Sequence, residues 1–240
     1  MSAWDQFEDL AGDVLRNQLI DMVKSANTFA PRTQQRHLGP SQIGDPCTKC
    51  LAAKILGVHD RGPFDDPWCA ILGTATHSWL EKAAKKDNRN NNAAWCTEVR
   101  VFPDDDLLPA GGKADVYQDT TGTVIDHKIV GAPMLKKYKA GGPGLTYRRQ
   151  AHLYGLGFAK TGVAVNTVAI AFWLRGGRLT DLYVWTEPYD ETIALATLDR
   201  YRTLRELCET GGVAIVGSLP SDPGCFTCNR NNTAALKATA

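Results

Sequence analysis

The sequence lacks any long apolar run. No stretch of its 240 residues stays apolar over the roughly 20 positions that a membrane-spanning helix needs. The first residues, MSAWDQFEDLAGDVLRNQL, are acidic and amphipathic, and they have neither the positively charged region nor the apolar region of a secretory signal peptide. We therefore expect a cytoplasmic protein with no membrane partner.

The chain also lacks an excess of charge. Its formal net charge is only +1, so there is no overall electrostatic signature of nucleic-acid binding, and any such surface has to be local. No G-x-x-x-x-G-K-[ST] segment occurs, which argues against a P-loop helicase. What is present, a hydrophobic fraction of 43%, is typical of a soluble globular domain with its own core.

The pattern of apolar residues changes period along the chain. Helical spacing runs to about residue 26, and Pro/Gly-rich loops separate it from predicted helices over 47–57 and 66–86. The polar tract 87–94 reads as a turn. Alternating segments predict strands over 94–102, 111–119 and 122–130, then a helix over 147–162, a hairpin turning at Gly176–Gly177, and a long helix from Pro188 to Gly211. This order indicates a single α/β (α+β) domain.

One predicted strand, TVIDHKIV, carries an acid and a lysine on the same face, at Asp126 and Lys128. An exposed ion pair is the simplest interpretation. Asp115 on the preceding strand favours a metal site over an exposed ion pair. A two-residue Thr120–Thr121 loop or a four-residue DTTG loop places Asp115 directly opposite Asp126. Opposed like charges need a cation between them, and Mg²⁺ or Mn²⁺ suits carboxylate oxygens better than Lys128 does. A type I turn with a glycine bulge would instead put the two acids on opposite faces.

These residues, together with several flanking motifs, carry a resemblance to a known family. The flanking motifs are GTATHSWLEKA with His77, RRQAHLYG with Gln150 and Tyr154, GPSQIGDPC, and the cysteines near the C-terminus. From about residue 36 to residue 228 the chain resembles the RecB-like exonuclease branch of the PD-(D/E)XK nuclease superfamily. The resemblance implies a restriction-endonuclease-like core, with a central mixed β-sheet flanked by helices. It departs from the family pattern in having Asp at position 126, where Glu is commoner, and no Pro before Asp115.

Roles for individual residues follow from that resemblance. Asp115, Asp126, His77 and the backbone carbonyl of His127 would hold Mg²⁺ or Mn²⁺, and Lys128 would orient the attacking water or stabilise the developing charge. Gln150 and Tyr154 would line the site and contact DNA, although an amphipathic helix edge would look the same. A lone histidine such as His77 is more often structural. Glu98 is either a further acid of the site or an exposed strand residue.

A local basic cluster follows the acid-x-lysine motif. It comprises Lys136, Lys137, Lys139, Arg148 and Arg149. Most such clusters are solvated surface, but directly after a nuclease-like motif we expect a path for the DNA backbone.

Four of the seven cysteines form two C-x-x-C pairs, Cys47 with Cys50 and Cys225 with Cys228. Together they supply four thiolates, enough for zinc or for a 4Fe–4S cluster, and either would join the N-terminal segment to the C-terminal one. The resemblance favours 4Fe–4S, whereas the two-plus-two spacing favours zinc, since iron–sulfur relatives have one cysteine upstream and three downstream. The other three, Cys69, Cys96 and Cys208, are predicted to be buried thiols.

The sequence thus predicts a metal-dependent deoxyribonuclease, an exonuclease that hydrolyses phosphodiesters from free or single-stranded DNA ends in recombination, repair or DNA processing. The resemblance includes phage-encoded and CRISPR-associated members, which would act in the host cytoplasm. Two alternatives stay open: a non-catalytic DNA-binding module stabilised by zinc or iron–sulfur, and an endonuclease of the junction-resolvase or restriction type. A homo-oligomer or a protein partner is compatible with each of them. The predicted organisation is an N-terminal helix and linker over 1–35, the nuclease domain over 36–228 and a disordered tail over 229–240.

Overall fold

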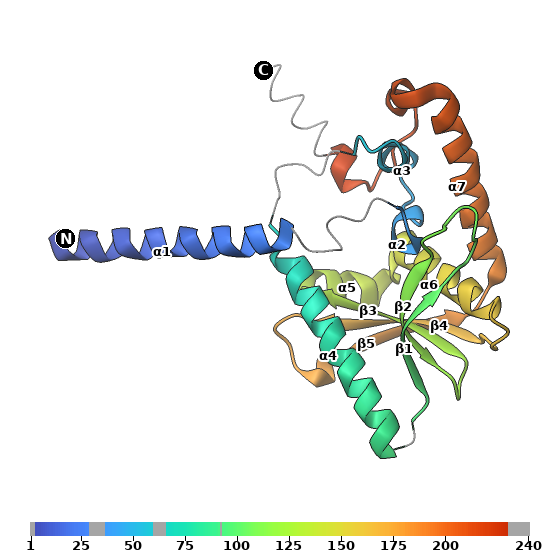
Figure 1. The fold of residues 1–240 in the computed structure, drawn as a ribbon, viewed down its shortest axis with the longest axis horizontal. Coiled ribbons are helices and arrows are strands. Elements are labelled where there is room, and N and C mark those ends of the chain that lie inside the picture. Colours follow the sequence, from blue (N-terminus) through green and yellow to red (C-terminus); the bar gives the residue numbers. More distant parts are fainter. Residues whose placement is uncertain (1–2, 29–36, 60–65, 92, 230–240) are drawn as a thin grey trace.

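The computed structural model describes residues 3–28, 37–59, 66–91 and 93–229. Helix α1, Ala3–Thr28, confirms the predicted first helix and projects away from the remaining elements (Figure 1). Two short helices, α2 at Pro40–Ile43 and α3 at Thr48–Ile55, precede the long helix α4, Trp68–Asn91. In the described part of the chain, no helix is both long and apolar enough to cross a membrane.

A five-stranded mixed sheet forms the centre of the fold. Its strands are β1 (Trp95–Val101), β2 (Gly112–Gln118), β3 (Thr123–Val130), β4 (Thr167–Leu174) and β5 (Tyr183–Pro188), and they lie side by side in chain order. Strands β3 and β4 are parallel, whereas the other neighbours are antiparallel. A parallel pair needs a crossover connection. Here α5 (Ala132–Gly141) and α6 (Gly144–Ala159) supply it.

Helices cover both faces of this sheet. Helix α4 packs on β1 and β3, α6 packs on β1, β3 and β4, and α7 (Glu191–Gly211) lies behind α6 (Figure 1). Two buried clusters result, one between the sheet and α5–α6, the other between α6, α7, α2 and α3. The predicted class, a central mixed sheet flanked by helices, is confirmed.

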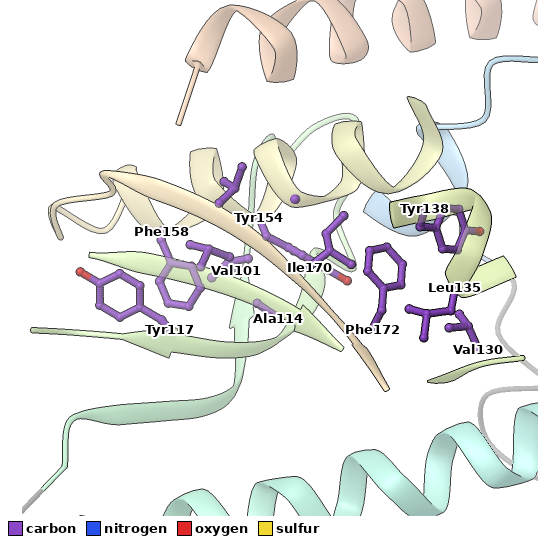
Figure 2. Close-up of a cluster of buried hydrophobic side chains, with 13 residues drawn as sticks. Val101, Ala114, Tyr117, Val130, Leu135, Tyr138, Tyr154, Phe158, Ile170 and Phe172 are labelled. Atoms are coloured by element: carbon purple, nitrogen blue, oxygen red, sulfur yellow. The ribbon is translucent and has the colours of Figure 1, made fainter. Parts of the chain in front are cut away.

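Helix α6 is buried on both sides along its C-terminal half, which explains why apolar residues and glycines there do not follow a helical period. All nine residues from Gln150 to Phe158 are buried. In Figure 2, Tyr154 of α6 lies beside Ile170 of β4, and Phe158 of α6 lies beside Tyr117 of β2. This stretch, enclosed by the sheet and by α7, has no solvated face, so its few polar side chains need partners inside the protein.

Close packing of α6 on β1 depends on a glycine. A Cβ atom added at Gly157 would lie 2.7 Å from the Cβ and Cγ2 atoms of Val101. We expect Gly157→Ala to lower the free energy of unfolding by about 1–3 kcal/mol, because the buried strand cannot move away. Gly141→Ala is the matched control, since nothing lies within 4 Å of its added Cβ. Denaturant unfolding of both variants measures the difference, and equal midpoints would contradict this account of the packing.

Several sequence-based boundaries differ from the structure. The polar tract 87–94 is not a turn throughout, because α4 continues to Asn91 and the Asn88 amide pairs with both backbone groups of Trp95. Pro188 ends β5 rather than opening α7, whose N-cap is Asp190. The β4–β5 connection spans 175–182 and is wider than a two-glycine turn. Helix α5 was not predicted.

Two of the three cysteines outside the C-x-x-C pairs were predicted wrongly. Cys208 is buried, as expected, but Cys69 and Cys96 are exposed. Cys96 lies on the edge strand β1, whose outer positions face solvent. The predicted disordered tail lies outside the described residues from 230 onward, and the proposed domain boundaries remain a prediction.

Candidate active site

Three acids lie in a row across adjacent strands. The β2–β3 ladder pairs Val116 with Ile125 and closes through a four-residue loop, 119–122, with Gly122 at φ +63°. This is the register that places Asp115 opposite Asp126, so the glycine-bulge alternative is wrong. On the other side, the β1–β2 pairs Thr97–Val116 and Val99–Ala114 place Glu98 opposite Asp115.

Asp126 is a buried carboxylate, only 2% exposed. Gln150 Nε2 donates to its Oδ1 at 2.8 Å. Its Oδ2 lies 2.5 Å from Lys128 Nζ, yet this oxygen accepts no directed hydrogen bond among the described residues. Burial raises the pKa of Asp126, with the Asp115 charge adding to the effect and Lys128 opposing it. A buried carboxylate that already pairs with an ammonium group, next to a second acid, lies where a cation is favoured.

Asp115 is fixed by two donors from separate elements. His77 Nδ1 on α4 lies 3.1 Å from its Oδ1, and the backbone N–H of His127 donates to its Oδ2 at 2.7 Å. Burial acts to raise the pKa of Asp115, but these hydrogen bonds and the His77 charge outweigh it and lower the pKa overall. Burial likewise opposes protonation of His77, while the Asp115 hydrogen bond and charge raise its pKa above the usual value. The two groups therefore stabilise each other as an ion pair.

Glu98 joins this group through an unusual backbone conformation. It has φ +57° inside β1, and it is the one non-glycine residue with positive φ in the described part of the chain. One ligand atom from each of His77, Glu98 and Asp115 lies within 4.8 Å of the others. Glu98 also pairs with Lys113 at 2.5 Å. Strained backbone is frequent at functional sites. Aligning the predicted strands 94–102 and 111–119 as an antiparallel pair could have placed Glu98 opposite Asp115 from the sequence.

The donor set suits a hard divalent cation. It combines two carboxylates, Glu98 and Asp115, with the imidazole of His77, and Asp126 lies opposite Asp115 on the next strand. Mg²⁺ and Mn²⁺ prefer such oxygen-rich sites. Glu81, four positions after His77 on α4, could reach the His77 ring, and Gly73 lies four positions before it. The structure instead pairs Glu81 with Lys85 at 2.6 Å, and nothing lies within 4 Å of a Cβ added at Gly73. The support for His77 comes from Asp115.

Lys128 has a second neighbour besides Asp126. Its Nζ lies 4.9 Å from the centre of the Tyr147 ring, a cation–π arrangement at the start of α6. Gln150 also contacts the Tyr154 hydroxyl, with Nε2 donating at 3.4 Å. The Gln-x-x-x-Tyr element therefore reaches the acids directly through Gln150, and Tyr154 lies behind it in the core.

The side chain of His127 has a role that the sequence did not reveal. Burial lowers its pKa to about 4, so the ring is neutral near pH 7. Trp173 Nε1 donates to His127 Nδ1 at 3.2 Å. The His127 ring also contacts the His77 ring edge-on, with 5.9 Å between the ring centroids. The Trp173 hydrogen bond links β4 to His127, the residue between Asp126 and Lys128, and holds the His127 ring beside His77.

The predicted basic cluster divides into two parts. Lys136, Lys137 and Lys139 are exposed on α5, directly after β3. Arg148 instead pairs with Glu187 at 2.6 Å, next to the fully buried His152, and Arg149 donates to the Gly44 carbonyl at 3.3 Å. The two arginines are thus engaged in contacts within the protein, whereas the three lysines are exposed, with Lys139 Nζ 5.8 Å from the centre of the Tyr183 ring.

The two C-x-x-C pairs come together as predicted and join the N- and C-terminal segments. Sulfur–sulfur distances are 3.7 Å between Cys47 and Cys228, 3.4 Å between Cys50 and Cys225, and 3.6 Å between Cys50 and Cys228. Burial and the neighbouring thiols raise the pKa of Cys50, and burial raises that of Cys228 to about 11. Four thiols at this spacing favour a bound cation, which stabilises all of them as thiolates.

Comparisons with known proteins give only distant structural likenesses. No protein-family model and no curated protein matches the chain. An alkaline exonuclease, LHK-Exo, from Laribacter hongkongensis is 13% identical over 77% of this chain and 97% of its own, with a TM-score of 0.45. The structure of LHK-Exo in complex with dAMP is 14% identical over 73% of this chain and 89% of its own, with a TM-score of 0.48. A phage-related exonuclease from Haemophilus somnus is 13% identical over 69% of this chain and 82% of its own, with a TM-score of 0.42. The chemistry of the site therefore rests on its own residues.

Glu98 provides a test of the cation site that leaves the predicted motif intact. We expect Glu98→Gln to raise the Mn²⁺ concentration needed for half-maximal binding by roughly 10-fold, because it removes one of the grouped carboxylate charges. Titration calorimetry with Mn²⁺ measures the shift. Glu81→Gln is the control, since that acid pairs with an exposed lysine. Unchanged affinity in Glu98→Gln would remove Glu98 from the site.

Proposed function

We propose that the protein is a metal-dependent deoxyribonuclease, acting as an exonuclease on DNA ends. One observation carries the proposal: the buried Asp126 lies opposite Asp115, with Lys128 Nζ 2.5 Å from its Oδ2. Lys128 offsets part of the cost of burying that carboxylate beside a second acid, and a divalent cation would offset more of it. A site of this kind has little reason to exist for structural stability alone.

The proposed ligands are Asp115, Asp126, His77 and the backbone carbonyl of His127. In an extended strand the N–H and C=O of one residue leave the chain on the same side. The His127 N–H donates to Asp115, so its carbonyl is proposed to face the same gap between β2 and β3. Glu98 is a further candidate. A bound Mg²⁺ or Mn²⁺ would lower the pKa of a water molecule and polarise the phosphoryl oxygen.

The remaining residues have positioning and electrostatic roles. The Lys128 ammonium group would orient the attacking water or stabilise negative charge on the phosphate, and its place over the Tyr147 ring limits where it can move. Gln150 holds one oxygen of Asp126, and Lys128 lies 2.5 Å from the other, which a bound cation would share with Lys128. The exposed lysines of α5 would contact phosphates along the DNA backbone.

Three DNA substrates test the proposal. End-labelled linear duplex, end-labelled single strand and covalently closed circles are incubated with Mn²⁺. Degradation of the linear DNA with intact circles is expected. Nicked or linearised circles would favour an endonuclease of the junction-resolvase or restriction type instead. DNA binding without cleavage under Mg²⁺ or Mn²⁺ would replace the enzyme with a non-catalytic binding module.

A further inference from the structure

We propose that the four-cysteine site holds a single zinc ion in tetrahedral coordination, not the 4Fe–4S cluster that the family resemblance implies. The inference does not depend on the nuclease function, since it concerns only Cys47, Cys50, Cys225 and Cys228.

The sulfur separations decide between the two groups. Four thiolates around one zinc ion, at Zn–S distances of about 2.3 Å, lie about 3.8 Å from one another. In a 4Fe–4S cubane each thiolate binds a different iron atom at an outer corner, which separates the thiolates by roughly 6 Å. The separations between Cys50 and Cys225, Cys50 and Cys228, and Cys47 and Cys228 are 3.4, 3.6 and 3.7 Å, and all four sulfurs lie within 4.8 Å of one another. They match the single ion, and a cubane does not fit between them.

Backbone hydrogen bonds tie together the segments that carry the two pairs. The N–H of Lys49, between the first two cysteines, donates to the carbonyl of Pro220 at 3.1 Å. Arg200 of α7 donates to the carbonyls of Asp45 and Pro46, at 2.8 and 3.1 Å, and anchors the segment that leads into Cys47. Moving the pairs apart by the ~3 Å that a cubane needs would break the Lys49–Pro220 bond.

The two C-x-x-C segments also have equivalent local structure. In each, the carbonyl of the first cysteine accepts a hydrogen bond at 3.0 Å from the N–H four residues later, Leu51 for Cys47 and Asn229 for Cys225. Each segment therefore presents two thiols from one helical turn. Two equivalent two-thiol units facing each other complete a tetrahedron, the arrangement of structural zinc sites.

An iron ion would accept the same four-thiolate geometry, but the general affinity order places zinc above Fe²⁺ at such a site. Zinc has no accessible redox chemistry, so the site would be structural and insensitive to reduction.

Metal analysis of the intact chain tests the proposal. The protein is expressed with added iron and zinc, purified without oxygen, and assayed for metals and acid-labile sulfide. We expect one zinc ion per chain, no sulfide and no absorbance band near ~400 nm. About four iron and four sulfide per chain, one iron alone, or a metal-free chain would each overturn the proposal.

Variants locate the ion. Cys50→Ser is expected to reduce zinc to below about one tenth of an equivalent, whereas Cys96→Ser and His77→Ala should each retain one. Zinc lost in His77→Ala but kept in Cys50→Ser would place the ion at the carboxylate site and contradict the inference. If Cys50→Ser does not fold, exchange of the wild-type protein into Co²⁺ provides the second measurement. Tetrahedral four-thiolate coordination gives absorption at roughly 600–750 nm, and its absence would overturn the proposal.

Discussion

Asp126→Asn is expected to reduce Mn²⁺-dependent DNA degradation by about a thousand-fold or more while leaving the protein at least as stable as wild type. The two effects have one cause. Asp126 is buried with a raised pKa, so its ionised form is unfavourable in the fold, and a neutral amide of the same shape removes that cost. The same amide carries no charge with which to hold a divalent cation.

Initial rates on end-labelled linear DNA, with thermal unfolding of the same samples, measure both effects. Asp119→Asn is the matched control, since this acid lies exposed in the loop between β2 and β3. It should keep wild-type activity. An Asp126→Asn protein that still degrades DNA within a few-fold of wild type would remove Asp126 from the metal site.

Loss of the four-cysteine site is expected to have the largest effect on stability. Cys50→Ser should lower the free energy of unfolding by about 4 kcal/mol or more, because the site connects residues that are 175 or more positions apart in the chain. It also anchors α2 and α3 beside α6 and α7, which form the second buried cluster.

Guanidinium unfolding followed by tryptophan fluorescence measures this loss. Cys96→Ser, a substitution of an exposed cysteine on β1, is the control and should unfold at the wild-type midpoint. Wild-type protein treated with a strong chelator should approach the Cys50→Ser midpoint. Equal midpoints for Cys50→Ser and wild type would show that the site contributes nothing to folding.

Errors in the sequence-based elements arose where tertiary contacts outweigh local preference. Asparagine is a poor helix former, so the tract after Lys86 predicts a turn. In the structure, the Asn88 side chain satisfies both backbone groups of Trp95, and Asp87 accepts a bond from the Trp95 indole. Contacts with the first strand extend the helix. Helix α5 was missed for a related reason, since its apolar face is short and its sequence is dominated by lysines.

The basic cluster shows the same limit for function. Sequence proximity grouped Arg148 and Arg149 with the lysines of α5. Helix α6 is enclosed on both sides, so adjacent positions point to different neighbours, Glu187 for Arg148 and Gly44 for Arg149. The sequence gives no measure of that enclosure.

Local information by itself determined the strands and the two thiol pairs, because each depends on residues a few positions apart. It also offered the DTTG loop and the opposition of Asp115 and Asp126, but only the observed β2–β3 register excluded a shift by one residue. The tertiary structure alone decided the rest. Helix α4 brings His77 to Asp115, and α6 brings Gln150 to Asp126. Glu98, with its positive φ, lies with His77 and Asp115. The sulfur separations likewise depend on how α3, α7 and the C-terminal segment pack. These distances join residues far apart in the chain, and only the packing of a common core fixes them.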